Sequence, residues 1–209
     1  MAWDVEGTKR KIHEAALTEF AQHGPAGTTI DKIAKSAGVN RERVYNYFGG
    51  KEALFATVIR GELDRLAAAV PLQHVTGPQD LAQFAGQAFD YQHERPAVAR
   101  LVLWEGLAVT GTVQDEALRT GLYTSKTRVV AAAQEAGLVN DSIAAPHLVF
   151  ALIALASHWF AAPQMARMLS ADDAGRGDTH AHRREAVMEA ARQIATPQSQ
   201  EPPPGSSRE

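Results

Sequence analysis

Residues 28–51 have the sequence TTIDKIAKSAGVNRERVYNYFGGK, and this stretch decides the fold. Thr28 is followed three residues later by Asp31, a pattern typical of a helix N-terminus. Apolar residues then recur at helical spacing up to Gly38, which can end the helix in a left-handed conformation. Asn40 can cap a second short helix. Because that second helix is too polar to be buried, the two helices and their glycine turn predict a helix-turn-helix.

The second short helix has the side chains that read DNA. Arg41 and Arg43 lie in its first turn, and arginine pairs bidentately with guanine. Asn40 and Asn46 are alternative partners for adenine. The alternative for the whole helix is a solvated surface whose charges contact nothing. Five further side chains suit phosphate oxygens, namely Thr28, Thr29, Tyr45, Tyr47 and Lys51.

Extended to Phe55, this stretch resembles the DNA-binding domain of the tetracycline-repressor-like (TetR) family. The resemblance is carried by the paired threonines, the I-x-x-I-A-x-x-A-G-V run, and Y-x-Y-F followed by K-E-x-L-F, within residues 8–60. It implies an all-helical fold with a three-helix DNA-binding head and a larger helical body, which dimerises and holds a small-molecule pocket. Glu42, Arg43 and the Gly49–Gly50 pair depart from the residues usual in the family, so the operator sequence does not follow from the resemblance.

The chain has 209 residues, enough for a small head and a body with a substantial core. Its composition, 45% hydrophobic and 22% charged, is ordinary for a globular protein. The formal charge of −3 is unevenly divided, because residues 1–51 contain eight Lys and Arg against six Asp and Glu, and residues 52–209 contain 13 against 18. A basic head on an acidic body concentrates the affinity for phosphate at one end.

Several classes of protein are excluded or disfavoured by what the sequence lacks. Without cysteine the chain has no disulfide, no thiolate metal site and no thiol nucleophile. The first residues, MAWDVEGTKRK, contain no apolar signal-peptide core, so we expect a cytoplasmic location. Alternating strand patterns with Asn-Gly or Asp-Gly turns are missing, and we therefore predict an all-α fold.

The chain divides into three parts: a helix-turn-helix head over residues 1–51, a ligand-binding and dimerisation domain over residues 52–195, and a disordered tail over residues 196–209, which are rich in Pro, Ser, Gln and Gly. A first helix over residues 4–23 ends at the Gly24–Pro25 breaker. Residues 52–70 have one apolar face and link head to body; in the TetR family the tilt of this helix sets the separation of two recognition helices. The other predicted helices cover residues 79–94, 96–110, 114–136, 146–162 and 182–194, with a flexible loop over 171–179.

Residues 146–162, PHLVFALIALASHWFAA, are apolar on nearly every side. A membrane span is the alternative, but the apolar run is shorter than the roughly 20 residues that a span requires. A helix that is apolar all round must be buried all round, and a second copy of the chain is the economical cover. With the apolar stripe of residues 182–194, it predicts a homodimer held by a four-helix seam, which the resemblance also implies.

A small-molecule pocket is typically an apolar cavity with a few placed polar groups. Trp104 is as readily a core residue, and His158 an interface residue. Glu105 lies in an apolar helix and needs a partner, for which Arg100, Arg128 or a cationic effector are the candidates. The body residues predicted to bind a ligand are Tyr91, Trp104, Glu105, Tyr123 and His158.

The motifs of helical and other common enzymes are missing. A di-iron bundle needs two Glu-x-x-His motifs, whereas this chain offers a single Asp90-x-x-His93. His180 and His182 have no further ligands nearby, and no phosphate-binding glycine loop, nucleophile elbow or H-E-x-x-H motif occurs. We therefore expect no metal, no cofactor and no enzymatic activity.

The leading hypothesis is a homodimeric regulator of transcription, most simply a repressor that an unknown small-molecule effector releases from double-stranded operator DNA. Two alternatives remain. One is a DNA binder that responds to no effector. The other is a helical small-molecule-binding or catalytic protein with a vestigial DNA-binding head.

Overall fold

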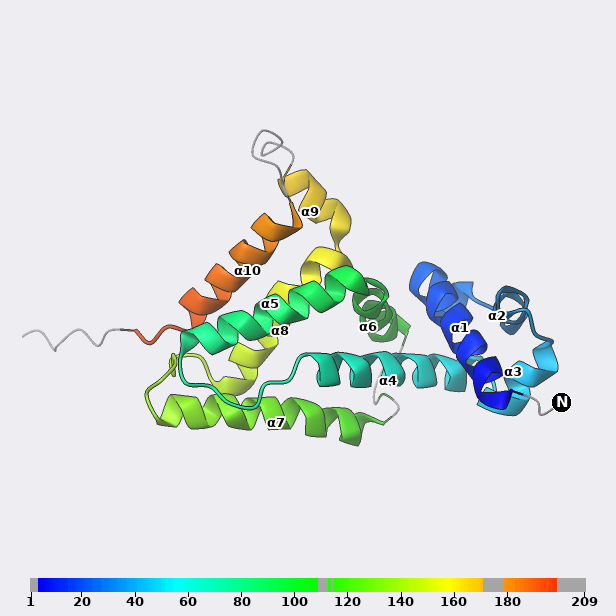
Figure 1. Cartoon of the computed structure of the whole chain (residues 1–209), viewed down its shortest axis with the longest axis horizontal. Coiled ribbons are helices and arrows are strands. Elements are labelled where there is room, and N and C mark those ends of the chain that lie inside the picture. Colours follow the sequence, from blue (N-terminus) through cyan, green and yellow to red (C-terminus); the bar gives the residue numbers. More distant parts are fainter. Residues whose placement is uncertain (1–3, 109–112, 114, 171–178, 199–209) are drawn as a thin grey trace, which may run out of the picture.

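The computed structural model describes residues 4–108, 113, 115–170 and 179–198. Every regular element in these residues is a helix, which confirms the predicted all-α fold. The first helices form a head, drawn at the right of Figure 1: α1 (Val5–Gly27), α2 (Ile30–Ala37) and α3 (Arg41–Phe48). The remaining helices lead into the body and build it: α4 (Lys51–Ala69), α5 (Pro78–Glu94), α6 (Ala97–Ala108), α7 (Glu116–Glu135), α8 (Ala145–Ala161), α9 (Pro163–Leu169) and α10 (His180–Ala195).

The head has its own hydrophobic core. Ile12 of α1, Ile33 of α2 and Val44 of α3 are fully buried in it. The ring of Phe20 meets Phe55 of α4 edge-on, with 5.1 Å between the ring centroids. Val44 is the buried anchor of α3, so the other side chains of this helix lie at or near the surface. The core of the head therefore includes the start of α4 as well as the first three helices.

The threonine pair before α2 is divided between two roles. Thr29 caps α2, because its hydroxyl accepts a hydrogen bond from the Lys32 amide at 3.3 Å. Thr28 is buried, and its hydroxyl donates to the Glu19 carbonyl of α1 at 3.1 Å. The predicted helix start was thus wrong by one residue: Thr28 fastens α2 to α1 instead of capping it.

The turn between α2 and α3 is confirmed in detail. Gly38 ends α2 in the left-handed conformation, with φ 65°. The side chain of Asn40 caps α3 by accepting from the Arg43 amide at 3.1 Å. Both local signals were readable because each acts on residues that are close in the sequence.

Helix α1 is kinked at its predicted breaker, and the kink creates a docking point for the body. Gly24 adopts φ 67° and ψ 172°, after which one more turn follows. Because Pro25 has no N–H, the carbonyl of Ala21 lacks its usual helical partner. Helix α6 supplies donors instead: Arg100 Nε lies 2.7 Å and Trp104 Nε1 3.4 Å from this oxygen.

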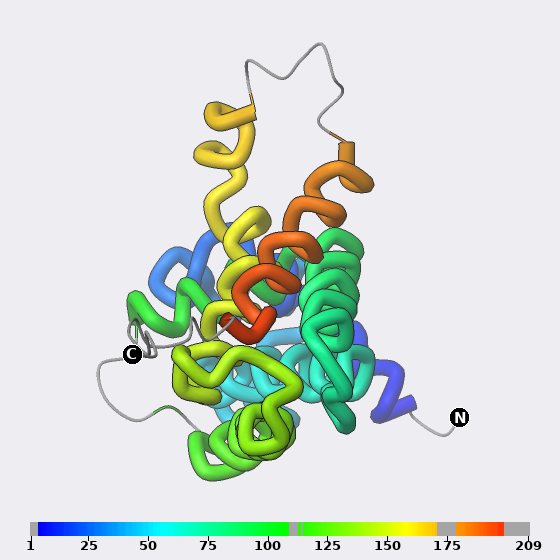
Figure 2. The backbone as a smooth tube through the Cα atoms, turned by 90° about the vertical axis from the view of Figure 1, so that its left-hand side faces the viewer, coloured from blue at the N-terminus to red at the C-terminus, as the bar shows by residue number. Residues whose placement is uncertain are grey.

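The body packs its helices around a second core. Helix α10 lies against α5 and α8, and α7 packs on α8 (Figures 1 and 2). Phe89 of α5, Leu152 of α8 and Ala191 of α10 are buried at this centre. Helix α6 contacts α1 and α4 on one side and α8 on the other, so it stands between the head and the body. Its Leu101 is fully buried in the core of the head.

The end of α8 differs from the prediction. The chain turns by 89° after α8 and continues as the short helix α9, which starts at Pro163, a residue suited to a first helical turn. No single helix among the described residues is long and apolar enough to cross a membrane; α8 and α9 reach that length only as a bent pair. The predicted loop over residues 171–179 and the predicted tail after residue 196 fall mostly outside the described residues.

Replacing Gly24 with Ala should destabilise the protein more than replacing Gly38 with Ala. Both glycines have positive φ, and such positions cost other residues about 1–3 kcal/mol. A Cβ at Gly24 would also lie 2.7 Å from the Trp104 ring, whereas a Cβ at Gly38 would meet nothing within 4 Å. Urea unfolding of the two variants measures the difference.

A second pair of variants separates the cost of the clash with the Trp104 ring from the cost of the backbone strain at Gly24. In a Trp104→Leu background the extra loss caused by Gly24→Ala should shrink, because the ring that the new methyl group strikes is gone. An extra loss of the same size in both backgrounds would show that the Trp104 ring does not set the cost of Gly24→Ala.

Candidate DNA-binding surface and internal cavity

Helix α3 lies at the end of the head that is far from the body (Figure 1). The side chains of Glu42, Tyr45 and Asn46 are exposed on it. The Arg41 side chain is 60% exposed, and its Nη1 lies 3.6 Å from Asp31 Oδ1 of α2. Its guanidinium carbon also lies 5.5 Å from the centroid of the Tyr45 ring. Exposed contacts of this kind contribute little stability, so Arg41 can exchange them for a ligand.

The other residues predicted to touch DNA are not equally placed. Thr29 is exposed, while Arg43, Tyr47 and Lys51 are partly buried. Asn40 is exposed, but its Oδ1 is engaged in capping α3, which leaves Asn46 as the better-placed amide for a base edge. Thr28 is only 1% exposed and does not lie on this surface.

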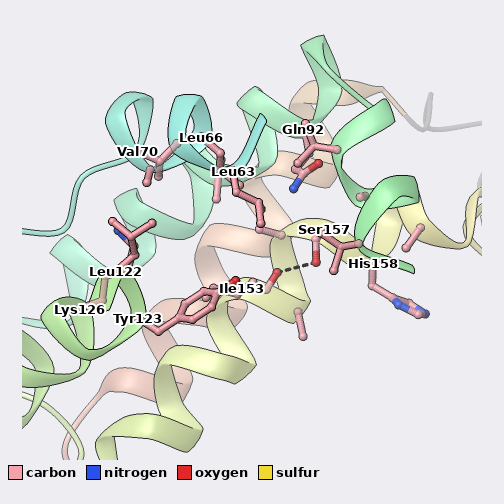
Figure 3. Close-up of a pocket in the computed structure, with 18 of the residues that line it drawn as sticks. Leu63, Leu66, Val70, Gln92, Leu122, Tyr123, Lys126, Ile153, Ser157 and His158 are labelled. Atoms are coloured by element: carbon pink, nitrogen blue, oxygen red, sulfur yellow. Dashed lines mark hydrogen bonds between the residues drawn. The ribbon is translucent and has the colours of Figure 1, made fainter. Parts of the chain in front are cut away.

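The body contains an apolar cavity of about 230 Å³ between α4, α5, α6, α7 and α8 (Figure 3). Its walls are mostly aliphatic, and its volume lies just below the roughly 300–1,000 Å³ of common ligand pockets. Val102 and Leu103 of α6 and Leu122 of α7 line it while remaining more than a third exposed, so the cavity opens near these two helices. The polar residues in the walls are Gln92, Arg119, Tyr123, Lys126, Ser157 and His158.

Two of these polar residues already have partners within the chain. Arg119 donates from Nη1 and Nη2 to the two carboxylate oxygens of Glu105, at 2.6 and 3.0 Å. Ser157 donates to the Ile153 carbonyl at 2.8 Å, as Figure 3 shows. Gln92 is only 5% exposed, and its Oε1 makes no hydrogen bond with any described residue.

Residues 12–58 match the family model for bacterial regulatory proteins of the tetR family, and residues 80–193 match the model for the tetracyclin repressor-like C-terminal domain. The chain belongs to the TetR family. The resemblance found in the sequence is therefore confirmed. The chain is a DNA-binding regulator of transcription with a helix-turn-helix, and the members of its family are not enzymes. TetR regulators bind operator DNA and small-molecule effectors and are typically dimers.

Several individual TetR proteins are similar over most of this chain. The transcriptional repressor SCO4008 of Streptomyces coelicolor is 39% identical over 195 residues, which cover 92% of this chain and 97% of the relative. The regulator RutR of Escherichia coli K12 is 31% identical over 165 residues, or 74% of each chain. The crystal structure of SCO4942 from Streptomyces coelicolor aligns with a TM-score of 0.78 at 31% identity, covering 90% of this chain and 98% of that one.

The five predicted ligand-binding residues of this TetR protein lie in different places. Tyr123 and His158 line the cavity, although the His158 ring points away from the other labelled side chains in Figure 3. Trp104 and Glu105 lie outside the wall: Trp104 packs on the head, and Glu105 binds Arg119. Tyr91 is also outside it, and burial raises the pKa of its hydroxyl.

The predicted partners of Glu105, Arg100 and Arg128, were wrong. Arg100 instead donates to the Ala21 carbonyl, and the partner of Glu105 is Arg119. The cavity residues Gln92 and Lys126 were not predicted either. The position of Lys126 could have been predicted from the sequence. It follows Leu122 by one helical turn, which places a charge on the apolar seam of α7. The inward direction of Gln92 depends on how α5 crosses its neighbours, which no local pattern indicates.

A buried ion cluster fixes the linking helix of this TetR chain. Glu62 of α4 is fully buried, and its carboxylate accepts hydrogen bonds from Arg65 and, at 2.7 and 3.1 Å, from Arg95. The hydrogen bond to Glu62 raises the pKa of Arg95. Nearby, burial and then the charge of Arg65 lower the pKa of His13, so its imidazole favours the neutral form. The cluster ties α4 to Arg95, the C-cap residue of α5, two residues before α6 begins.

Among the described residues, no group of three or more His, Asp or Glu side chains is arranged to hold a metal ion.

Proposed function

We propose that this chain is a homodimeric repressor that leaves its operator when a small molecule occupies the body cavity. The observation that carries the proposal is the double role of α6. Val98, Ala99 and Val102 of this helix line the cavity. Leu101 and Trp104 belong to the core of the head or pack against it. A ligand that displaces the cavity wall therefore acts on a helix that also touches the DNA-binding head.

Helix α4 offers a second route between the two sites. Its first turns are part of the head, where Leu54 and Val58 are fully buried. Its last turns contribute Leu66 to the cavity wall, and its C-cap residue Val70 also lines it. In a symmetric dimer the two recognition helices must meet half-sites about 34–36 Å apart, so a shift of a few ångströms in α4 or α6 spoils the match. A coupling of about 1–3 kcal/mol is enough to change operator affinity 5- to 150-fold.

In this proposal the exposed face of α3 enters the major groove. Arg41 and Arg43 read base edges, with Asn46 as the neighbouring amide. Thr29, Tyr47 and Lys51 contact phosphate groups and fix the register. The partial burial of Arg43 and Tyr47 limits their freedom, which suits side chains that must keep a fixed direction in the groove.

Replacing Arg41 or Arg43 with Ala should relax sequence preference, whereas replacing Lys51 with Ala should weaken binding to all duplexes alike. Each lost base contact costs about 1–3 kcal/mol, while a lost phosphate contact carries no sequence information. The measurement is fluorescence anisotropy with the duplex recovered by the protein from fragmented genomic DNA and with a scrambled duplex, at several salt concentrations. If both arginine variants discriminate between the duplexes as well as the native protein does, the base-reading assignment is wrong.

The dimer is proposed to form through residues 146–162 and 182–194. The predicted apolar stripe of 182–194 is not free for this contact, because Val187 and Ala191 are buried in the core of one chain, so α10 would use its remaining exposed face. On α8, Phe150 is 74% exposed within one chain, although α8 is one of the most apolar helices. On the adjoining α9, Met168 and Leu169 are 66% and 77% exposed. An apolar surface of this kind calls for a cover, and a second copy of the chain related by a two-fold axis supplies it.

Replacing Phe150 with Asp should convert the dimer into monomers and lower operator affinity. The change removes an apolar side chain worth about 1.5–3 kcal/mol when buried, and the two-fold axis doubles the loss. The matched control is Leu118→Asp, because Leu118 is 67% exposed on α7, outside the proposed seam. Light scattering during size-exclusion chromatography gives the mass of each variant. A Phe150→Asp protein that remains dimeric at micromolar concentration places the seam elsewhere.

Compounds that bind the body should change operator affinity by about 5- to 150-fold, as expected for ordinary allosteric coupling. Thermal-shift screening of a metabolite library selects binders, and the anisotropy of the recovered duplex is then measured with each of them. Ala154→Trp is a useful control. Ala154 lines the cavity, so the larger side chain should fill the cavity and prevent binding. If compounds bind the native protein but not the Ala154→Trp variant, and yet leave operator affinity unchanged, the protein is a constitutive DNA binder.

A further inference from the structure

The walls of the cavity carry positive charge without negative charge. Lys126 and Arg119 both line it, and no Asp or Glu is among the described lining residues. The charge of Arg119 is balanced, because its guanidinium forms a two-oxygen ion pair with Glu105 just outside the wall. The side-chain ammonium of Lys126 makes no hydrogen bond or ion pair with any described residue. The uncompensated charge of the cavity is therefore at Lys126.

The surroundings of Lys126 are apolar. Its Nζ lies 5.7 Å from the centroid of the Phe84 ring, which is also part of the wall. The adjacent turn of α7 contributes Leu122 to the same wall. Burial lowers the pKa of the Lys126 ammonium, a sign that water has been partly removed from a charge that has no counterion. A negative group in the cavity would supply that counterion.

A second residue in the wall also lacks a partner. Gln92 is 5% exposed, and its buried Oε1 accepts no hydrogen bond from a described residue. Buried polar groups are normally satisfied, so this amide indicates that another molecule completes the site. In Figure 3, Lys126 is at the left and Gln92 is above and to the right of it, with Leu63 and Leu66 between them.

We propose that the cavity binds a compact, mainly apolar organic acid whose negatively charged group pairs with Lys126. The apolar skeleton lies along the leucines of α4, and a polar group at its other end reaches Gln92. This inference rests on the proposed function, because it places the effector in the same cavity. A cation is disfavoured, since it would meet Lys126 and Arg119 without a carboxylate in the wall. A neutral compound would leave the charge of Lys126 uncompensated.

Matched probes separate these classes without knowledge of the natural ligand. The set comprises 3-phenylpropionate, 3-cyclohexylpropionate and 4-methylpentanoate, each with the corresponding primary amide and primary amine. Isothermal titration calorimetry with the full chain measures their affinities. The carboxylates should bind at least about tenfold more tightly than the amides, as expected for one charge-assisted hydrogen bond, and the amines should not bind.

Two variants assign the preference to one residue. Lys126→Met keeps an unbranched apolar stem and should reduce the carboxylate-to-amide ratio to about one, because the counterion is lost. Arg128→Met removes a positive charge from the exposed side of the same helix and should leave the ratio unchanged. Circular dichroism confirms that both variants are folded. Lys126→Arg, which keeps the charge, should retain a preference for the carboxylates.

The proposal is overturned if no carboxylate of the set binds, if the amides bind as tightly as the acids, or if Lys126→Met keeps the preference. Operator affinity is measured separately with the same compounds. Acids that bind through Lys126 without changing operator affinity would support the ligand class and refute ligand-induced release. Release of the native protein from its operator by the amides or amines, with no effect of the carboxylates, would support release and refute the ligand class.

Discussion

The arrangement of the whole chain depends on one unsatisfied carbonyl in the head. Pro25 cannot donate to Ala21, so the last full turn of α1 exposes an acceptor that a straight helix would have hidden. Arg100 and Trp104 of α6 satisfy it, and the Trp104 ring covers the kink at Gly24. A break that looks like the simple end of a helix is thus the point at which the body holds the head.

The linking helix adds a second constraint at a different place. Glu62 is buried in the middle of α4, and its carboxylate is stabilised by Arg65 and Arg95. Loss of an arginine partner would leave the buried carboxylate of Glu62 less compensated, so α4 cannot easily slide against the junction of α5 and α6. Head and body are thus joined at two separate points, the Ala21 carbonyl and the Glu62 cluster. Together these two contacts fix the orientation of the head relative to the body. A single hinge would leave its direction undefined.

The sequence predicted the head far better than the body, for a physical reason. Gly38 and Asn40 act on neighbours a few residues away, so their roles are visible in the local pattern. The places of Trp104 and Glu105 depend on partners at residues 21 and 119, and hence on the angle at which α6 crosses α1 and α7. Helical periodicity identifies the apolar face of α6, but it does not say which helix packs against each side of α6. The cavity lies between five helices that cross in this way, so it could be expected from family resemblance but not located residue by residue.

The same crossings give the charges of the cavity a direct connection to the head. Lys126 and Arg119 are both on α7, and the ion pair of Arg119 with Glu105 joins that helix to α6. Glu105 directly follows Trp104, which packs against the kink of α1. An anion drawn to Lys126 would therefore act on α7, and through one short ion pair on the helix that holds the head. Coupling of this kind needs contacts that have two stable arrangements, and ion pairs and a ring packed on a glycine can break and reform more readily than a continuous hydrophobic core can deform.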